Sequence, residues 1–217
     1  MFAQNENSTG INEARYAMVI YDLYSGWLSF SAQAKKTAAK AKQALKRFDP
    51  ASRIKSFYCD NAPELIQAAR DLGYSNPTST PYRSTSNAVA ERQNRVVLEG
   101  TRTVLSQSGC PTYWWPYAGH HFCFSRIITP HPITGVSPFK KRYPERKDFD
   151  GLRLPFGCAV DFRPPDHVLK EMGKFDEQPL PGLFLGYKVP PGGIWNKENC
   201  VAWFKNIFRG GHTTRHV

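Results

Sequence analysis

The sequence predicts an α/β domain followed by a smaller all-β domain. Within residues 16–108, segments rich in β-branched and aromatic residues alternate with segments of helical periodicity, which is the pattern of a sheet covered by helices. Beyond residue 153, three short β-type runs are separated by Pro and Gly turns, and this suits a small barrel or sandwich. With 217 residues, of which 41% are hydrophobic, the chain can bury one core and a small satellite.

The charge balance favours a polyanionic partner. Lys and Arg total 29 against 18 Asp and Glu, which gives a net charge of +11. No apolar stretch approaches the about eighteen residues that span a bilayer, and the start MFAQNENSTG lacks the basic and apolar regions of a signal peptide. We therefore expect nucleic acid, rather than a membrane, as the partner.

The five cysteines are scattered, odd in number and without a CxxC pair, so neither a disulfide framework nor a zinc ribbon is expected. A reducing, intracellular compartment fits this usage. His120 and His121 stand shortly before Cys123 and could begin a metal site, but no second pair of ligands follows at a suitable spacing. Packing within an aromatic-rich helix is the preferred interpretation of these residues.

The first elements follow from turn and cap signals. We expect residues 1–13 to be a disordered start and residues 16–30 to form a β-hairpin. An Ala-rich amphipathic helix follows, with Ser31 as a possible cap and Pro50 as its stop. The lysines of this helix most simply form a solvated face, and contact with DNA is the alternative.

The middle of the chain is predicted to contain a strand and three helices. Residues 53–59 predict a short strand, and Pro63 opens a helix that Gly73 closes. A loop rich in Ser, Thr, Asn and Pro leads to a long helix over residues 87–108, and a second helix covers about residues 112–127. The aromatic residues of that last helix are more often core than a ligand cradle.

The expected domain organisation divides the chain near its Pro-rich and charged middle segment. Residues 14–130 form the core domain, and residues 131–152 form a linker or an arm wrapped on that core. Residues 153–209 form the small β domain, and residues 210–217 form a disordered tail.

Two carboxylates stand out by their positions. Asp60 follows a predicted strand and Glu91 lies in the first turns of the long helix, with Asn87 and Arg95 one turn to either side of it. Mg²⁺ takes few protein carboxylates and leaves positions open for phosphate oxygens, so the pair could hold such an ion. The alternatives are a cap or strand-end role for Asp60 and a surface ion pair with Arg95 for Glu91.

Around these carboxylates the sequence resembles the integrases of retroviruses and long-terminal-repeat retrotransposons, most closely those of the Copia type. The segments FYCDNAPEL and TPYRSTSNAVAERQNRVVLEGTRTVL carry the resemblance, and the segment YWWPYA continues it. Two later segments, ITGVSPFKKRYPERKDFDGLRLPFGCAV and KFDEQPLPGLFLGY, resemble the blocks that follow in that family. The resemblance extends from about Tyr16 to Phe204.

The resemblance implies an RNase H-like core, a mixed sheet flanked by helices, followed by a small SH3-like β-barrel domain. It further implies a catalytic Asp, Asp, Glu triad that binds two Mg²⁺ or Mn²⁺ ions, in which Asp60 matches the second Asp and Glu91 matches the Glu. No Asp precedes Asp22, and Asp22 matches an acidic position that is not a ligand in the family. The first triad Asp is therefore expected to lie upstream, and Asp22 is either a turn residue or a weak substitute for it.

The implied activity is processing of retroelement DNA at its 3′ ends and strand transfer into target DNA. The chain would act as a homo-oligomer in the nucleus or in a cytoplasmic virus-like particle. The alternative is an inactive relic or a domesticated module for DNA binding or assembly. Contacts with nucleic acid are expected from residues on the long helix and the loop before it: Arg83, Asn87, Arg92, Asn94, Arg95 and Arg102.

Overall fold

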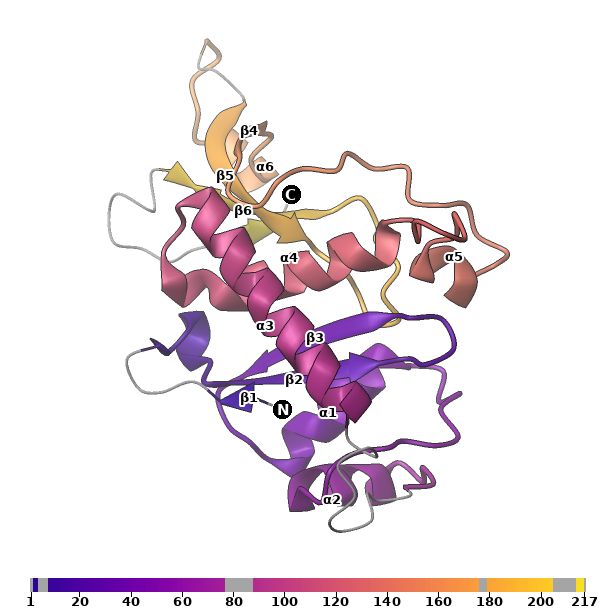
Figure 1. Ribbon diagram of the computed structural model, residues 1–217. Helices are drawn as coiled ribbons and strands as arrows, with labels where there is room; N and C mark the ends of the chain where they lie inside the picture. Colours follow the sequence, from indigo (N-terminus) through magenta and orange to yellow (C-terminus); the bar gives the residue numbers. More distant parts are fainter. Residues whose placement is uncertain (1, 4–7, 77–87, 176–178, 205–213, 217) are drawn as a thin grey trace.

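The computed structural model describes residues 2–3, 8–76, 88–175, 179–204 and 214–216. They form two antiparallel sheets with helices on and between them (Figure 1). The first sheet contains β1 (Phe2–Ala3), β2 (Tyr16–Tyr21) and β3 (Leu28–Gln33), and the second contains β4 (Ala159–Phe162), β5 (Leu180–Tyr187), β6 (Asn199–Trp203) and β7 (Thr214–His216). The helices are α1 (Ala38–Phe48), α2 (Pro63–Asp71), α3 (Ala88–Ser108), α4 (Trp115–Ile128), α5 (Pro138–Arg142) and α6 (Asp166–Leu169), with short 3-10 turns η2 (Ile11–Glu13) and η4 (Thr112–Trp114).

The predicted hairpin is confirmed. Strands β2 and β3 pair antiparallel from Tyr16 opposite Gln33 to Tyr21 opposite Leu28. Because successive strand residues face opposite sides of a sheet, the burial of both Ala17 and Met18 means that both faces of β2 are covered. Helices α3 and α1 both pack against β2, and α3 crosses the sheet diagonally in Figure 1.

Helix α1 begins later than expected. Ser31 is wrong as its cap, because that residue pairs with Met18 in the β2 and β3 ladder. The cap is Thr37, whose Oγ1 accepts a hydrogen bond from the Lys40 backbone N–H at 3.3 Å. The strand continues as far as Gln33, whose buried side-chain amide donates to the Lys40 carbonyl at 3.2 Å.

The lysines near α1 contribute to packing as well as to solubility. Lys36 pairs with Glu64 at 3.0 Å, and Lys42 pairs with Asp71 at 3.4 Å. Both carboxylates belong to α2, so these pairs fasten the second helix of the domain beside the first. Helix α2 itself matches the prediction, since it begins at Pro63 and is followed by Gly73 with φ of +70°.

The strand predicted over residues 53–59 is wrong in its extent. Within the described part of the chain the segment forms a single parallel bridge, between Ser56 and Ser75, where Phe57 N donates to the Ser75 carbonyl at 2.9 Å. Most side chains of the segment are exposed, so a longer ladder would gain little from packing. The bridge nevertheless places Cys59 in the core, immediately before Asp60.

Helix α4 lies between the two sheets. Its buried residues surround the helix: Trp115, Ala118, Gly119, His121, Cys123, Phe124, Ile127 and Ile128. On one side Gly119 lies against Phe30 of β3, and on another side Phe124 contacts Tyr187 of β5, with ring centroids 4.7 Å apart. A helix that is apolar on all sides is buried on all sides, and α4 therefore joins the two sheets into one core.

Residues 131–152 lie on the core along much of their length. The buried Tyr143 donates its hydroxyl hydrogen to the Gly192 carbonyl, and Arg142 stacks on Phe48, with its guanidinium 4.2 Å from the ring centroid. Farther along, Tyr187 donates to the Leu152 carbonyl at 2.7 Å. These contacts tie the arm both to the first domain and to the second sheet.

Both ends of the chain make contacts with the rest of the fold where the structure describes them. Trp115 Nε1 donates to the Ser8 carbonyl at 3.1 Å, and Ile11 of η2 is buried. At the other end, β7 pairs with β6 in the second sheet. Residues 8–13 and 214–216 therefore make long-range contacts that composition does not reveal.

His121 is buried between α4 and the second sheet. Its ring lies 5.7 Å from the Phe156 ring and stacks at 6.0 Å on the Tyr187 ring. Among the described residues its Nδ1 has no hydrogen-bond partner, and Ser125 Oγ lies 3.4 Å from its Nε2. Burial in this apolar shell lowers the pKa of His121 to about 4, so the imidazole is neutral in the folded protein.

Stability is expected to fall as the pH drops below about 6.5, the pKa of an unfolded histidine. Below that pH His121 binds a proton in the unfolded chain, whereas in the folded protein it stays neutral until about pH 4. The contribution of His121 to the free energy of unfolding is therefore complete above pH 6.5 and lost by pH 4. The loss is roughly 3 kcal/mol. The pKa of His120 is lowered in the same direction.

Urea unfolding at pH 7 and pH 4.5 measures the effect. His121→Phe should flatten the profile, His167→Gln on the surface should not, and an unchanged profile in His121→Phe contradicts the assignment.

Candidate functional site

Asp60 stands between the buried Cys59 and the start of α2. The side chain of Asp60 is exposed. The neighbouring Cys59 anchors the backbone here, because its Sγ donates to Asn76 Oδ1 at 3.6 Å. Burial, and secondarily the Asp60 charge, raise the pKa of the Cys59 thiol. The alternative role as a helix cap is not observed, because the N-cap residue of α2 is Ala62. Asp60 is thus a surface carboxylate on a backbone that the core fixes.

Glu91 lies in the first turn of α3 and is exposed. At about 100° per residue, Arg95 and Arg102 lie within roughly 40° of it round the helix, so the three side chains share one face. A neighbouring face of the helix carries the buried Val97 and Thr101. Within the described part of the chain Glu91 forms no ion pair, so the pair with Arg95 considered as its alternative role is not formed.

The two carboxylates are suitable donors for a divalent cation, although they form an incomplete set. Both are exposed oxygen ligands without a protein partner in the described residues, and hard cations prefer such ligands. In Figure 1, α2 and the first turn of α3 lie at the same end of the molecule. Among the described residues, no three His, Cys, Asp or Glu side chains gather closely enough to hold a metal ion. The residues described here therefore supply at most two of the ligands.

Asp22 serves the hairpin turn. Its Oδ1 accepts a hydrogen bond from Tyr24 N at 3.1 Å, and its Oδ2 accepts one from the Ser25 hydroxyl. Its own backbone N–H donates to the Trp27 carbonyl at 2.9 Å. Both carboxylate oxygens of Asp22 thus accept hydrogen bonds inside the turn, as expected of a turn residue.

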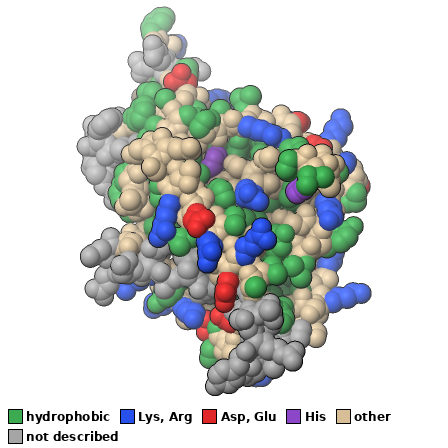
Figure 2. Space-filling view, viewed as in Figure 1, with side chains coloured by type: hydrophobic (Ala, Val, Ile, Leu, Met, Phe, Trp, Pro, Cys, Tyr) green, Lys and Arg blue, Asp and Glu red, His purple; other side chains and the backbone are tan. Residues whose placement is uncertain are grey.

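The residues expected to contact nucleic acid have different surroundings. Arg92, Arg95 and Arg102 are exposed along α3, whereas Asn94 is half-buried. Basic and acidic side chains alternate over α3 on the face shown in Figure 2. Arg83 and Asn87 lie outside the described residues. The exposed arginines are free to reach a phosphate backbone, which positions nucleic acid without reading its sequence.

The buried carboxylate of Asp49, which the sequence does not indicate, holds the backbone of the segment that leads to Asp60. Asp49 is 2% exposed, and its Oδ2 accepts a hydrogen bond from Ile54 N at 2.7 Å while Arg53 lies 3.6 Å from its Oδ1. It therefore fixes the turn between α1 and the segment that ends at Asp60. The Asp-Pro pair at the helix end was the available signal, and it indicates a turn rather than burial.

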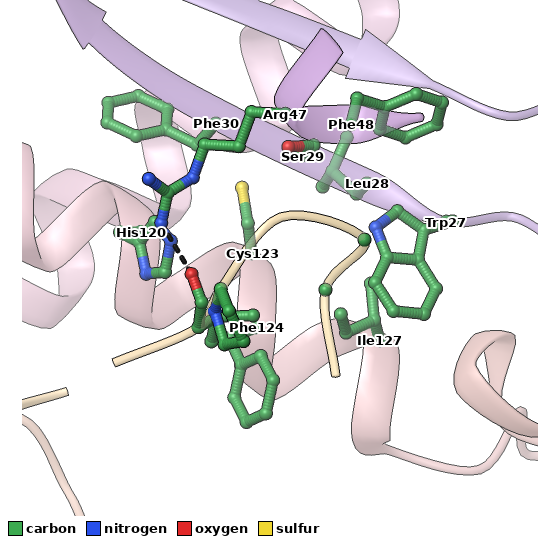
Figure 3. A pocket seen from close by; sticks show the side chains of 14 residues that line it. Trp27, Leu28, Ser29, Phe30, Arg47, Phe48, His120, Cys123, Phe124 and Ile127 are labelled. Carbon is green, nitrogen blue, oxygen red and sulfur yellow. Dashed lines mark hydrogen bonds between the residues drawn. The ribbon is translucent and has the colours of Figure 1, made fainter. Parts of the chain in front are cut away.

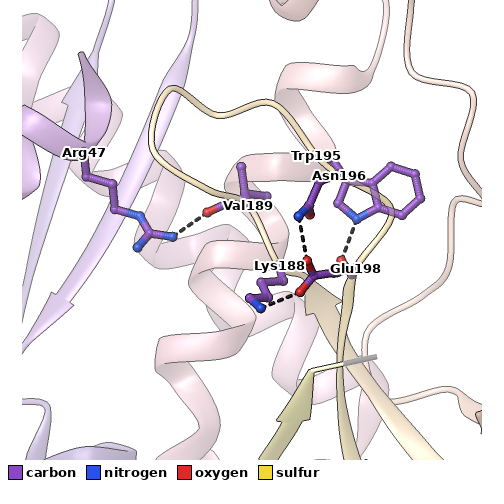
Figure 4. Close-up of polar contacts among 6 residues, drawn as sticks. All are labelled: Arg47, Lys188, Val189, Trp195, Asn196 and Glu198. Carbon is purple, nitrogen blue, oxygen red and sulfur yellow. Dashed lines mark hydrogen bonds and ion pairs between the residues drawn. The ribbon is translucent and has the colours of Figure 1, made fainter. Parts of the chain in front are cut away.

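A second candidate site is a cavity of about 40 Å³ between β3, α1 and α4. Its lining residues join these elements to one another, so it serves the packing of the fold. Arg47 crosses it to donate to the Val189 carbonyl, and His120 lines it (Figure 3). Burial, together with the Arg47 charge, lowers the pKa of His120 to about 4. Beyond Val189, the Glu198 carbonyl accepts from Trp195 Nε1 at 2.6 Å and the Glu198 side chain pairs with Lys188 (Figure 4). These contacts fix the loop between β5 and β6.

No protein-family model matches the chain. The retrovirus-related Pol polyprotein from transposon RE1 of Arabidopsis thaliana is 30% identical over 187 residues, which cover 81% of this chain and 12% of that protein. The corresponding polyprotein from transposon RE2 of the same plant is 30% identical over 82% of this chain and 13% of its own length. The polyprotein from transposon TNT 1-94 of Nicotiana tabacum is 26% identical over 76% of this chain. The chain thus spans about an eighth of the length of the curated relatives it matches.

Two solved structures resemble the fold. A chain of the simian T-cell lymphotropic virus intasome in complex with PP2A regulatory subunit B56 gamma matches 96% of this chain and 72% of its own length, with a TM-score of 0.51 and 14% identity. The catalytic core domain of BIV integrase matches 63% of this chain and 90% of its own length, with a TM-score of 0.47 and 21% identity. The first likeness confirms an α/β, RNase H-like fold. By its identity to the two Arabidopsis polyproteins over four-fifths of its length, the chain belongs to the family of Copia-type, retrovirus-related Pol polyproteins.

Proposed function

We propose that the chain is the catalytic core and following small domain of a retrotransposon integrase, which processes DNA 3′ ends and joins them to target DNA. The observation that carries the proposal is the arrangement on α3, where Glu91 shares an exposed face with Arg95 and Arg102. A carboxylate that is free to bind metal, flanked by cations that are free to bind phosphate, suits phosphodiester chemistry. The relatives are retrovirus-related, and one similar fold belongs to an intasome, which supports DNA as the substrate and a homo-oligomer as the working form.

In this proposal Asp60 and Glu91 hold Mg²⁺ or Mn²⁺. A bound ion of this kind would polarise the phosphodiester and lower the pKa of water. Arg95 and Arg102 would position the DNA backbone beside the carboxylates. The second sheet, β4 to β7, would be the SH3-like domain of the family, and the protein would work in the nucleus or in a virus-like particle.

A second candidate function is a non-catalytic module that binds DNA or supports assembly. The incomplete set of described ligands favours it, since two carboxylates alone hold a catalytic ion weakly. This candidate predicts DNA binding that needs no metal and survives Asp60→Asn. The integrase proposal predicts, in addition, metal-dependent joining of DNA ends.

Strand transfer separates the two candidates. The chain is incubated with Mn²⁺, a labelled duplex end and a plasmid. The integrase proposal expects joined products that disappear when Mn²⁺ is chelated. Salt-sensitive DNA binding without any joined product would leave the non-catalytic module as the function.

Neutralising Arg95 and Arg102 together is expected to weaken binding of a DNA duplex uniformly across sequences. For each arginine that binds a phosphate, its neutralisation should reduce the slope of log K against log salt by about 0.9. Fluorescence anisotropy at several salt concentrations measures the slope for Arg95→Gln/Arg102→Gln. Arg163→Gln, an exposed arginine near α6, is the matched control and should leave the slope unchanged. Equal slopes for all three proteins would remove α3 from the DNA-binding surface.

A further inference from the structure

Exposed apolar side chains lie on the β2–β3 turn and on the neighbouring arm. We name as the edge patch four hydrophobic residues and one lysine. Their exposed fractions are 74% for Leu23, 73% for Tyr24, 88% for Ile133 and 43% for Val136, and Lys141 completes the set. Single apolar residues are common on protein surfaces, whereas groups of them mark interaction sites. Burying these four side chains against a partner would be favourable.

The patch is built from two segments that lie together. Lys141 Nζ lies 4.9 Å from the centroid of the Tyr24 ring, and a Cβ on Gly26 would lie 3.9 Å from Pro138 Cγ. Figure 1 shows the tip of the β2–β3 hairpin close to α5. The loop that presents Ile133 is closed by a hydrogen bond from His131 N to the Val136 carbonyl at 3.1 Å. The surface is therefore largely formed before any partner arrives.

Most of the charges on the arm beside the patch are positive. Residues 138–147 contain five Lys or Arg and one acidic residue, Glu145. Two of the cations are already engaged, since Lys140 Nζ donates to the Arg146 carbonyl at 2.6 Å and Arg142 donates to the Phe48 carbonyl at 2.8 Å. Lys141, Arg146 and Lys147 are exposed. An incoming partner therefore meets an apolar surface with a cationic border.

We propose that the edge patch docks an acidic peptide segment of another protein that carries apolar side chains among its carboxylates. Apolar contacts at the centre and charged contacts at the rim are the usual anatomy of such an interface. Nucleic acid is a poorer match, because Leu23 and Ile133 offer it neither hydrogen bonds nor a stacking surface, and Lys141 already covers the Tyr24 ring. A second copy of this chain meeting its equivalent patch is also a poorer match, because the cationic borders of the two copies would then face each other. The proposal is independent of the proposed catalytic function.

The test uses amide-resolved NMR with three probes. The first is a synthetic peptide of alternating Glu and Leu or Phe residues, the second replaces its apolar residues with Ser, and the third is a short DNA duplex. The first peptide should shift the resonances of residues 22–27 and 131–147, and the Ser peptide should bind at least tenfold more weakly. Leu23→Ser/Ile133→Ser should reduce binding of the first peptide at least tenfold, whereas Phe175→Ser, a control on a fully exposed side chain elsewhere, should not.

Because the substituted side chains are exposed, the variants should keep the dispersed spectrum of the folded protein. No binding of the first peptide below about 1 mM overturns the proposal. Shifts confined to other residues also overturn it, as does equal binding of the two peptides. A DNA duplex that binds at these residues and loses affinity in the double variant, while the peptide does not, would instead assign the patch to nucleic acid.

Discussion

Replacing Glu91 by Gln is expected to lower metal-dependent strand transfer by at least about 100-fold. Losing a group that only supports a metal ligand typically costs roughly 10- to 100-fold in metal affinity or activity, and losing a ligand should cost at least as much. The substitution keeps the size of the side chain and removes its charge. Since Glu91 is exposed and forms no ion pair in the described residues, the thermal unfolding midpoint should change little.

The matched control is Glu99→Gln on the same helix. Glu99 is an exposed glutamate two turns farther along α3, so its replacement makes the same change in net charge. It should retain most of the activity, and Asp60→Asn should lose activity as Glu91→Gln does. Comparable losses in Glu91→Gln and Glu99→Gln would mean that α3 acts only through its overall charge, and Glu91 would not be a ligand.

Gly119→Ala is expected to destabilise the fold by about 1–3 kcal/mol, the usual cost of overpacking a core. In a helix interior this substitution ordinarily stabilises by about 1 kcal/mol, so the sign itself is informative. A Cβ at this position would lie 2.6 Å from Phe30 Cζ, which is inside van der Waals contact. Phe30 cannot easily withdraw, because it is 6% exposed and its ring packs edge-on against Trp115 at 6.0 Å. Chemical unfolding at neutral pH measures the difference.

The contact can be isolated with a double-mutant cycle. Phe30→Leu shortens the opposing side chain, so Gly119→Ala should cost less in that background than in the parent. Ser106→Ala on the exposed side of α3 serves as a control for helix propensity and should stay within about 0.5 kcal/mol of the parent. Stabilisation of the parent by Gly119→Ala would contradict the close approach of α4 and β3.

Local signals predicted the elements whose boundaries are set by local chemistry. The bounds of α2 and α3 are predictable because Pro63 starts a helix, and Gly73 and Gly109 adopt positive φ just after one. Ser31 was a reasonable cap by type, but its pairing with Met18 across the hairpin overrode that preference. The strand at residues 53–59 had strand composition without the burial that would sustain it.

Long-range packing was beyond the reach of single-sequence patterns. Tyr187 contacts residues of α4 and the arm, and nothing in the GLFLGY segment indicates those partners. At the candidate site, the sequence indicated Asp60 and Glu91 as chemical donors, and the structure adds that both are exposed and without protein partners in the described residues. It also assigns Asp22 to the turn through two hydrogen bonds that only the folded hairpin can form.

The most direct test of the central claim is whether Asp60 and Glu91 bind the same metal ion. Mn²⁺ is paramagnetic and broadens nearby amide resonances, so a titration of the chain followed by NMR locates the ion. We expect resonances around Asp60 and in the first turn of α3 to broaden together. Either Asp60→Asn or Glu91→Gln should relieve both sets, and Glu99→Gln should relieve neither. Broadening that is absent, or that persists at one segment when the other carboxylate is neutralised, would contradict a shared metal site.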